Sequence, residues 1–464
     1  MTDFATTVTE EQLLILKDAA LDFALSHGLV VRPPLPSKAD SPEAHALAGG
    51  VNNAPVSLFP TPFPTKAFNN AISIQPLFNQ LVHDISEDDA FLKEIMESLS
   101  TVDDFVKRLY DLYLLVKSEG ITQPASLGVY RSDYIIHLSP DQDLSDAKIK
   151  QVELNTISVS FGSLSSLTGD LHRYLMATTG YFSENANVAS VPVSDSIASI
   201  ASGLASAHQL YGSPTAKVMM VVQPGERNAF DQRYIEYNLL KNHNVLLIRK
   251  TLAEIEEQGR LDPQTKKLYI GDQEISVAYY RSAYATTDYP TEKLVGAKKV
   301  QQVLAAPGQL ERFVKDPKAA EQLRESFTGL YPLDASPEGL AAYESALVKY
   351  EDLVMKPQRE GGGNNIYGKD IPVELKKLTA EQRNAFILMD IIRPPITKNV
   401  LLRKGELQRA DVVSELGVYG IYLHDGAKVV RNDNGGHLLR TKGVESNEGG
   451  VAAGFAVIDS VMLV

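Results

Sequence analysis

The chain of 464 residues contains no cysteine. A disulfide framework, a thiolate nucleophile and a cysteine-ligated zinc site are therefore excluded. No apolar run reaches the roughly 18–20 residues that a membrane-spanning helix needs. Residues 1–11 also lack the basic, then apolar, then small-residue order of a secretory signal. We therefore expect a cytoplasmic protein without a membrane partner.

The sequence also lacks the basic character of a nucleic-acid-binding protein. It holds 45 Lys and Arg against 58 Asp and Glu, for a net charge of −13. Its content of 44% hydrophobic and 22% charged residues is typical of a globular protein. The nine histidines give no pair at the spacing of a helical zinc site, and no Gly-x-Ser-x-Gly motif occurs. The sequence therefore gives no support for a zinc hydrolase or for a serine hydrolase with a Gly-x-Ser-x-Gly nucleophile turn.

Local patterns predict both helices and strands. Thr9 and Gln12 fit a capping box that opens a helix ended by Gly28. A longer helical zone is expected from about Ser86 to Ser118. Alternating or apolar runs then predict strands at 134–138, 151–160, 353–357, 386–392, 400–402 and 412–423.

From about residue 217 the pattern changes to strand alternating with helix. We expect a strand at 218–222, a helix at 229–241, a strand at 245–248 and a hairpin of 268–270 with 275–280. Such alternation favours a small α/β module with parallel pairing. The predicted domains are an N-terminal part with a helical region at 1–213, this α/β module at 214–310, and a C-terminal part rich in strands and glycine at 311–464.

A glycine-rich segment from Lys356 to Asn365 carries the clearest chemical signal. A strand presents Lys356, then Arg359 and Glu360, and runs into Gly361, Gly362 and Gly363. Glycines let backbone N–H groups approach phosphate, lysine supplies a point charge, and a carboxylate can hold Mg²⁺. A solvated flexible loop is the alternative for the glycines alone. The spacing from Gly363 to Lys369 matches a P-loop, but Asp370 replaces the hydroxyl residue, and we reject that interpretation.

A second element places oxygen donors side by side. On a strand, residues two apart share a face, so Glu153 and Asn155 point the same way. Ser158 and Ser160 add polar positions beyond them. On the pattern alone, an amphipathic strand with its polar side in solvent is the more common interpretation. The presence of Glu360 on the glycine-rich loop favours a Mg²⁺ site.

Three arginines beside apolar strands, namely Arg131, Arg281 and Arg440, offer donor forks for carboxylates or acyl phosphates. Taken alone, such an arginine more often forms a surface salt bridge. Residues 226–228 and Gln232 follow the strand at 218–222, the usual ligand position in α/β sheets. Residues 448–454 form a further glycine-rich segment, which by itself indicates only a turn.

Together these strings resemble the eukaryotic-type glutathione synthetases. The matching stretches occur in the family's order and cover the chain from about Leu127 onward. They are 131–134, 153–162, 226–232, 298–302, 356–365, 438–442 and 449–454, with a further N-terminal likeness at 58–64. The stretch at 356–365 is the most specific of them.

The resemblance implies an α/β (α+β) ATP-grasp fold with an inserted smaller α/β substrate-binding domain, a glycine-rich lid and a homodimer. It implies ATP-dependent ligation of γ-glutamylcysteine and glycine to glutathione through an acyl phosphate, with release of ADP and phosphate. Mg²⁺, two ions per site, would be the cofactor. Phosphoryl transfer of this kind needs positioning and charge neutralisation rather than a protein nucleophile.

The resemblance also implies roles for individual residues. Mg²⁺ would be held by Glu153, Asn155 and Glu360. ATP would be bound by Glu153, Lys298, Lys356, Pro357, Gln358, Arg359, Glu360, Gly361, Gly362, Gly363, Asn364, Asn365, Tyr367, Met389, Asp390, Ile391, Ile392, Glu415, Lys442 and Glu448. The dipeptide would be bound by Arg131, Ile157, Ser158, Val159, Ser160, Glu226, Arg227, Asn228, Gln232, Arg281, Ser282, Ala283, Tyr284, Arg440, Val451 and Ala452. Of these, Arg131 and Arg440 are the expected catalytic residues.

Two departures from the family pattern are mild. The common Met-Glu-Lys-Ile adenine edge is Met389-Asp390-Ile391-Ile392 here, and Glu448 stands where relatives can have Asp. A synthetase that prefers β-alanine or serine to glycine is a close alternative, since one methylene is worth only about 1–3 kcal/mol. A silent nucleotide- or peptide-binding protein is the alternative from another class. Against it, Glu153, Asn155, Lys356 and Glu360 are all present.

Overall fold

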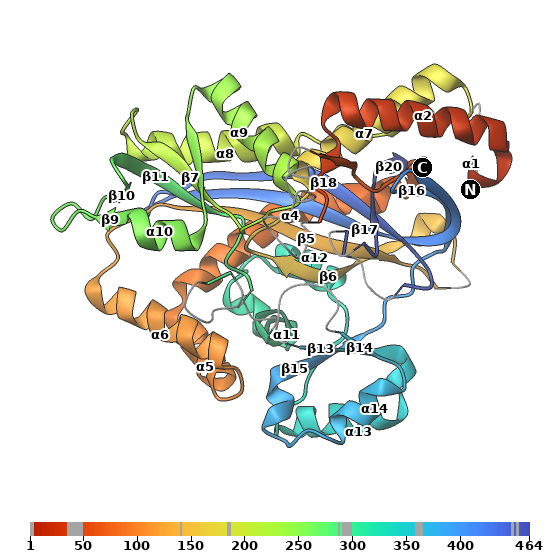
Figure 1. The fold of residues 1–464 in the computed structure, drawn as a ribbon. Coiled ribbons are helices and arrows are strands. Elements are labelled where there is room, and N and C mark those ends of the chain that lie inside the picture. Colours follow the sequence, from red (N-terminus) through yellow and green to blue (C-terminus); the bar gives the residue numbers. More distant parts are fainter. Residues whose placement is uncertain are drawn as a thin grey trace.

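The structure is a computed structural model that describes residues 4–34, 50–139, 142–182, 187–285, 288–289, 299–357, 365–446, 450–451 and 454–464. A seven-stranded sheet forms its centre (Figure 1). Its strands, in spatial order, are β16 (Thr397–Arg403), β3 (Val56–Ser57), β19 (Val457–Asp459), β18 (Val429–Gly443), β17 (Glu406–His424), β5 (Ser126–His137) and β6 (Lys148–Asn155). All neighbours are antiparallel except β3 and β19.

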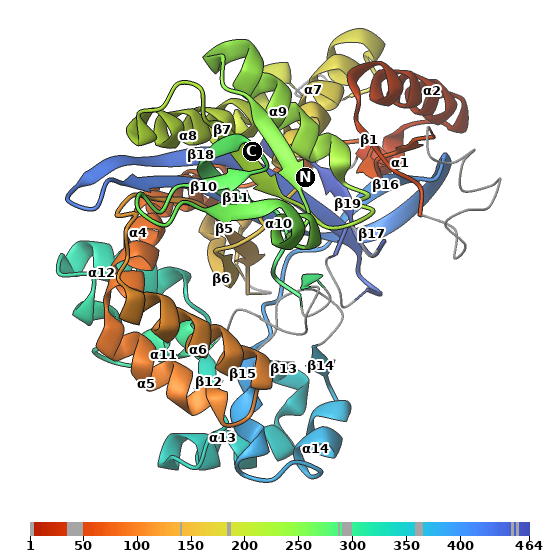
Figure 2. The same cartoon turned by 60° about the vertical axis from the view of Figure 1, so that its left-hand side comes forward.

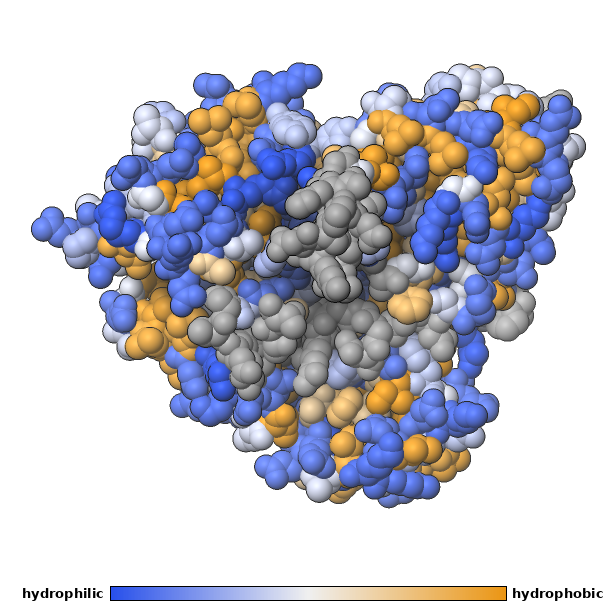
Figure 3. All heavy atoms as spheres, viewed as in Figure 1, coloured by the Kyte–Doolittle hydropathy of each residue, from blue (hydrophilic) through white to orange (hydrophobic). Residues whose placement is uncertain are grey.

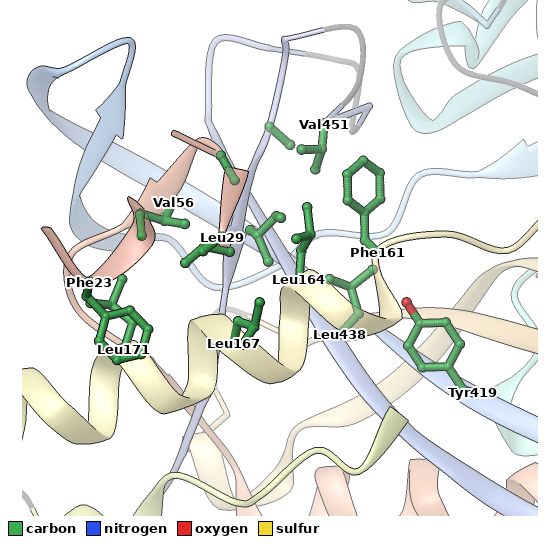
Figure 4. Close-up of a cluster of buried hydrophobic side chains, with 14 of the residues drawn as sticks. Phe23, Leu29, Val56, Phe161, Leu164, Leu167, Leu171, Tyr419, Leu438 and Val451 are labelled. Atoms are coloured by element: carbon green, nitrogen blue, oxygen red, sulfur yellow. The ribbon is translucent and has the colours of Figure 1, made fainter. Parts of the chain in front are cut away.

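Helices cover both faces of this sheet. Helix α4 (Thr65–Glu87) packs on one face, where Phe78 joins Leu416 and Leu439 in a buried cluster. Helices α7 (Gly162–Thr179) and α8 (Ser196–Tyr211) pack on the other. Figure 4 shows Leu164 and Leu438 in the cluster between α7 and the sheet. Burial on both faces explains why the centre of β17 is a continuous apolar run rather than an alternating one.

The N-terminal helices lie on the outer side of α7. Helix α1 (Phe4–Thr7) precedes α2 (Glu10–His27), whose Phe23 packs against Leu171 of α7 (Figure 4). The predicted capping box is confirmed, because Thr9 Oγ1 accepts from the Gln12 amide and Gln12 Oε1 accepts from the Thr9 amide. Gly28 ends the helix with a φ of +68°, a left-handed conformation that favours glycine.

The expected helical zone consists of two helices, α5 (Asp89–Ser100) and α6 (Asp104–Glu119). The Asp88 carboxylate caps α5 by accepting from the Phe91 amide, which separates α5 from α4. Short strands complete the outer parts: β1 (Val30–Val31) pairs with β2 (Asn52–Asn53), and β4 (Thr61–Phe63) pairs with β20 (Val461–Leu463). Of the helices in the described ranges, none combines the length and apolar character that crossing a bilayer requires.

A second sheet has the order β8–β7–β11–β10–β9. The expected parallel pairing is confirmed, since β7 pairs in parallel with both β8 and β11. The expected hairpin of β10 and β11 is confirmed as well. The elements are β7 (Lys217–Val221), α9 (Ala229–His243), β8 (Leu247–Lys250), α10 (Leu252–Gln258), β9 (Gly259–Leu261), β10 (Leu268–Ile270) and β11 (Gln273–Tyr280).

A third, antiparallel sheet has the order β12–β15–β13–β14. With its helices it forms a lobe at one end of the molecule, while the second sheet lies toward the opposite end in both ribbon views (Figures 1 and 2). The elements of the lobe are β12 (Leu330–Pro332), α13 (Pro337–Val348), β13 (Leu353–Pro357), β14 (Ile366–Tyr367), α14 (Asp370–Leu375) and β15 (Phe386–Asp390). Helices α11 (Lys299–Ala305) and α12 (Pro317–Ser326) precede them and belong to the buried cluster around α4.

The domain boundaries proposed from the sequence stay a prediction. The second sheet lies inside the 214–310 segment. That segment also contains α11, whose Leu304 belongs to the buried cluster around α4 rather than to the second sheet.

Candidate active site

A cavity of about 740 Å³ lies where the three sheets meet. Strands β5, β6, β17 and β18 of the central sheet supply one wall, and the loops that follow β7 and β11 supply another. Strands β13–β15 of the lobe supply the third. The predicted site residues that line it are Arg131, Glu153, Asn155, Ile157, Ser158, Val159, Ser160, Glu226, Asn228, Arg281, Tyr284, Lys356, Asn365, Tyr367, Met389, Asp390, Ile391, Ile392, Glu415, Arg440, Lys442 and Val451.

Strand register brings the polar residues of the central sheet onto one face. Arg131 lies opposite Asn155, and Asp133 lies opposite Glu153, after a register shift that leaves Val152 as the extra residue of a bulge. Glu415 lies directly opposite Arg440. Because directly opposed residues share a face, these side chains converge on the cavity.

Asp133 holds the two predicted catalytic arginines together. It is fully buried, and its carboxylate accepts hydrogen bonds from Arg131 Nε and Nη2 at 2.6 and 2.8 Å. Arg440 Nη2 donates to Asp133 Oδ2 at 2.8 Å and also to Glu415. Charge-assisted, partly bidentate bonds of this kind fix a guanidinium in orientation.

Burial alone would lower the pKa of each guanidinium, but the adjacent acids more than offset it. Asp133 raises the pKa of Arg131, and Glu415 and Asp133 raise that of Arg440. Both groups therefore stay cationic throughout the physiological range. Two fixed positive charges at the floor of a cavity suit a carboxylate or phosphate ligand.

Space for this network depends on Gly417 of β17. A Cβ atom at that position would lie 2.8 Å from Arg131 Cδ and 2.8 Å from Asp133 Oδ1. Neither atom can retreat easily, because both belong to the buried ion pair. Gly417 is therefore a close-approach glycine. Asp133 and Gly417 were not among the predicted site residues, although the spacing of Asp133 two positions after Arg131 already places both on one strand face.

The side chains of Glu153 and Asn155 fit the oxygen preference of Mg²⁺. Asn155 Nδ2 donates to Asp133 Oδ2 at 3.0 Å and to the Arg131 carbonyl at 3.3 Å. Both amide hydrogens are thus engaged within the protein, and Oδ1 is the atom left for a cation. In the ranges that the structure describes, no group of three His, Cys, Asp or Glu has an arrangement that could hold a metal ion. The expected third ligand, Glu360, lies outside those ranges.

The loop that follows β6 differs from the prediction. A strand was expected over 151–160, but β6 ends at Asn155. Ser158 and Phe161 have φ values of +55° and +69°, which no strand can contain. Several hydrogen bonds hold this loop. Ser158 Oγ donates to the Ser282 carbonyl at 2.9 Å, Tyr419 Oη and Arg131 Nη1 donate to the Ser160 carbonyl, and the Phe161 amide donates to Asp231. Figure 4 shows the Tyr419 hydroxyl pointing toward the start of α7.

The second sheet contributes the loops after β7 and β11. Glu226 accepts hydrogen bonds from the Asn228 amide at 2.7 Å and from Gln232 Nε2 at 2.9 Å. Buried Gln232, Ser282 and Ala283 therefore lie behind the lining rather than in it. Arg227 is exposed and contacts the backbone of Arg32 instead of the cavity.

The lobe side carries the predicted nucleotide residues. Lys356 is buried on β13, and its Nζ donates to the Val152 carbonyl at 3.1 Å across the cavity wall. Pro357 follows it outside the lining. Asn365 Nδ2 donates to Tyr367 Oη at 3.3 Å on the neighbouring strand. Residues 389–392 lie at the end of β15, where backbone groups are available to a ligand.

Ten predicted site residues lie outside the described ranges, so their positions stay predictions. They are Lys298, Gln358, Arg359, Glu360, Gly361, Gly362, Gly363, Asn364, Glu448 and Ala452. Residues that line the cavity but were not predicted are Ile135, Val152, Phe161, Gln223, Val354, Arg393, Pro394, Ile396, Val413, Val444, Ser446 and Gly450. Four of these, Ile135, Val152, Val354 and Val413, are apolar strand residues whose pattern alone indicates core packing.

A cavity between a lobe that presents lysine and a central sheet that presents arginines and oxygen donors defines an ATP-dependent ligase of the ATP-grasp type. The family model for the ATP-binding domain of eukaryotic glutathione synthase matches residues 10–463. The chain belongs to the eukaryotic glutathione synthase family.

Several relatives support this assignment along the whole chain. The chain is 40% identical to the glutathione synthetase of Xenopus laevis, over 97% of this chain and 96% of the relative. It is 40% identical to that of Homo sapiens, over 97% of each. The chloroplastic glutathione synthetase of Arabidopsis thaliana is 38% identical, over 96% of this chain and 84% of its own length.

A solved structure supports the fold. A glutathione synthetase-like effector from Globodera pallida in its apo form superposes with a TM-score of 0.76. The match covers 98% of both chains at 23% sequence identity. An identity this low speaks for the fold alone, and it agrees with the expected ATP-grasp architecture.

Proposed function

We propose that the chain ligates γ-glutamylcysteine and glycine to glutathione and converts ATP to ADP and phosphate. The observation that carries this proposal is the convergence of Arg131 and Arg440, locked by Asp133, beside Glu153 and Asn155. Cationic forks next to hard oxygen donors are the arrangement that phosphorylation of a carboxylate requires.

The reaction divides into two displacements. The dipeptide carboxylate attacks the γ-phosphorus of ATP, the bond to ADP breaks, and an acyl phosphate forms. The amine of glycine then attacks the acyl carbon, and phosphate leaves with the oxygen. Arg131 and Arg440 would orient the carboxylate and neutralise the charge that builds on the transferred group. Lys356 would bind the nucleotide phosphates as a point charge.

Two Mg²⁺ ions per site are part of the proposal. Glu153 and Asn155 would hold Mg²⁺ together with Glu360, and the metal would supply Lewis-acid stabilisation of phosphate charge. The amide orientation of Asn155 supports this role. Binding of Mn²⁺ in the presence of a non-hydrolysable ATP analogue, followed by electron paramagnetic resonance, measures the number of ions directly. Loss of one ion in Glu153→Gln is the expected result.

The assay for the activity uses ATP, Mg²⁺, γ-glutamylcysteine and glycine. Tripeptide, ADP and phosphate should appear in equal amounts, and Glu360→Ala should abolish nearly all turnover. Competition among glycine, β-alanine and serine identifies the preferred amine. ATP binding without phosphate release when both substrates are present would contradict the ligase and favour a silent binding protein.

A homodimer and a cytoplasmic address complete the proposal. Leu14, Ile15 and Leu25 of α2 are each about half exposed, and apolar surface gathers over this region in Figure 3. Such a patch supports association with a second copy. Sedimentation equilibrium tests the dimer. Cell fractionation tests the cytoplasmic location. The measurement is needed because the Arabidopsis thaliana relative is chloroplastic.

A further inference from the structure

Asp231 lies on α9, the helix that connects β7 and β8 of the second sheet, and is fully buried. Its carboxylate accepts four hydrogen bonds. Oδ1 accepts from the amides of Ser163 and Leu164 at 2.8 and 3.3 Å. Oδ2 accepts from the Phe161 amide at 3.0 Å and from Arg281 Nη2 at 2.8 Å. No other described carboxylate joins a helix start to a buried arginine at the cavity wall in this way.

The partners of Asp231 come from two separate parts of the fold. Phe161, Ser163 and Leu164 form the start of α7, which packs on the central sheet. Arg281 follows β11 of the second sheet. The first amides of a helix have no partner within it, so a carboxylate there is favourable. Here the cap comes from a distant segment and therefore joins the two parts across the site.

Both joined elements belong to the cavity wall. Arg281 lines the cavity, and so does the loop 156–161 that ends at Phe161. The same loop is fixed to the second sheet at another point, because Ser158 Oγ donates to the Ser282 carbonyl. Asp231 and Ser158 thus set the spacing between Arg281 and the loop. Among the described residues, the hydrogen-bond partners of the Asp231 carboxylate all lie at the start of α7 or after β11, and none lies on the Lys356 side of the cavity.

We propose that Asp231 is a positioning residue for the dipeptide half of the site. It holds Arg281 and the 156–161 loop at the spacing that fits the carboxylate and amide groups of γ-glutamylcysteine. This inference rests on the proposed function for the identity of the peptide. It goes beyond that function by assigning specificity for the peptide, and none for the nucleotide, to a residue that touches neither.

The test compares Asp231→Asn with wild type in the full-length protein. Asparagine keeps the size and one acceptor oxygen but turns an N–H₂ group toward donors that need an acceptor. The KM for γ-glutamylcysteine should rise at least tenfold, while the KM for ATP stays within twofold. Calorimetric binding of γ-glutamylcysteine without ATP should weaken by the same factor.

Asp170→Asn is the matched control. Asp170 lies on α7 and pairs with Arg173 at the surface, so this variant removes a helix carboxylate without touching the cavity. Its two KM values should equal those of wild type. Asp231→Glu, which restores the charge with a longer reach, should recover part of the affinity for the dipeptide.

A milder variant covers the case in which Asp231→Asn fails to fold. Ser163→Ala removes only the bond from Ser163 Oγ to the Asp231 carbonyl at 2.8 Å. It should raise the KM for γ-glutamylcysteine about two- to fivefold at an unchanged KM for ATP. Equal rises in both KM values, or no change in either for every folded variant, would overturn the assignment. A wild-type protein that forms no tripeptide would instead overturn the proposed function.

Discussion

The two faces of the central sheet each carry a buried aspartate, and their partners differ. On the cavity face, Asp133 accepts hydrogen bonds from the guanidinium groups of Arg131 and Arg440. On the opposite face, Asp459 accepts from the hydroxyls of Thr61 and Thr441, each at 2.6 Å. Arg440 and Thr441 are neighbours on β18, so their side chains leave the strand on opposite sides.

The chemical character of the partners separates the two acids. The two arginines bound to Asp133 both line the cavity. Around Asp459 burial raises the pKa of the carboxyl, even though nearby His172 and the hydroxyl bonds act against that rise. A buried carboxylate alone therefore does not identify a functional site. A buried carboxylate whose cationic partners line a cavity does indicate one.

The largest effect is expected for Asp133→Asn. The amide cannot accept from three donors, so Arg131, Arg440 and Asn155 all lose their common anchor. We expect kcat/KM to fall on the order of 100-fold, or about 3 kcal/mol of transition-state stabilisation. Steady-state kinetics with all three substrates varied in turn measures this loss.

Asp433→Asn provides a matched control for that variant. Arg431 and Asp433 form the same arginine–aspartate pair two residues apart on a strand of the same sheet, with Arg431 Nε donating to Asp433 Oδ2 at 2.8 Å. This pair is partly exposed and does not line the cavity. If Asp433→Asn lowered kcat/KM as much as Asp133→Asn does, any arginine–aspartate pair on the sheet would matter. The distinction between the cavity face and the rest of the sheet would then fail.

Gly417→Ala tests the space that the cavity-face network needs. A methyl group 2.8 Å from Arg131 Cδ must displace the guanidinium. We expect about a tenfold loss in kcat/KM, which corresponds to about 1.4 kcal/mol, with little change in thermal stability. Gly169→Ala on α7 is the control, because its Cβ would lie 3.4 Å from Arg173 Nη1, an ordinary van der Waals contact away from the cavity. Full activity in Gly417→Ala would contradict the close-approach role.

His437 on β18 tests the opposite face through pH. It is buried against the ring of Phe68 on α4, and burial, aided by Arg173, lowers its pKa to about 4. The unfolded chain therefore binds this proton first as the pH falls below about 6.5. The contribution to the free energy of unfolding is full above that pH. It is lost toward pH 4, by up to about 3 kcal/mol.

Urea denaturation of wild type and His437→Gln between pH 7.5 and 4.5 measures this contribution. The variant should show a shallower fall, by at most about 1.4 kcal/mol per pH unit. His243→Gln at the exposed end of α9 should leave the wild-type profile unchanged. An identical profile for wild type and His437→Gln would count against neutral burial of this ring.

The smallest effect is expected for Asp459→Asn. Hydroxyl partners can turn to donate or accept, so the amide should fit, and stability at neutral pH should change by only about 1 kcal/mol. Burial raises the pKa of Asp459 in the folded protein above its value in the unfolded chain. The contribution of Asp459 to the free energy of unfolding is therefore complete below the unfolded-state pKa and is lost as the pH rises through the folded-state pKa. Asp459→Asn should remove this pH dependence. The KM values of Asp459→Asn for γ-glutamylcysteine and for ATP should stay within twofold of those of wild type. A kinetic defect like that of Asp133→Asn would break the comparison.

Local patterns predicted the elements whose stability is local. The capping box of α2, the parallel β7–α9–β8 unit and the β10–β11 hairpin follow from neighbouring residues. The strand prediction over 151–160 was wrong past Asn155, because alternation of Ser and Val ignores the distant groups that hold the loop. Those groups are Asp231, Ser282 and Tyr419.

The site shows the same division. Residue types and the family resemblance predicted Arg131, Arg440, Glu153 and Asn155 as site residues, and all four line the cavity, while their roles stay predictions. Asp133 and Asp231 were missed because their roles depend on partners far away in the sequence, as with Arg440 for Asp133 and Phe161 for Asp231. Only register and helix placement reveal such partners, and neither is encoded in a short motif.

The bond between Asp133 and Arg440 joins positions 307 residues apart. Because closing so long a segment costs conformational entropy before any contact rewards it, we expect this pairing to form late in folding. The cavity can therefore take up nucleotide or peptide only once the chain has nearly finished folding. Ligands of this protein should then lower the rate of unfolding and leave the rate of refolding almost unchanged.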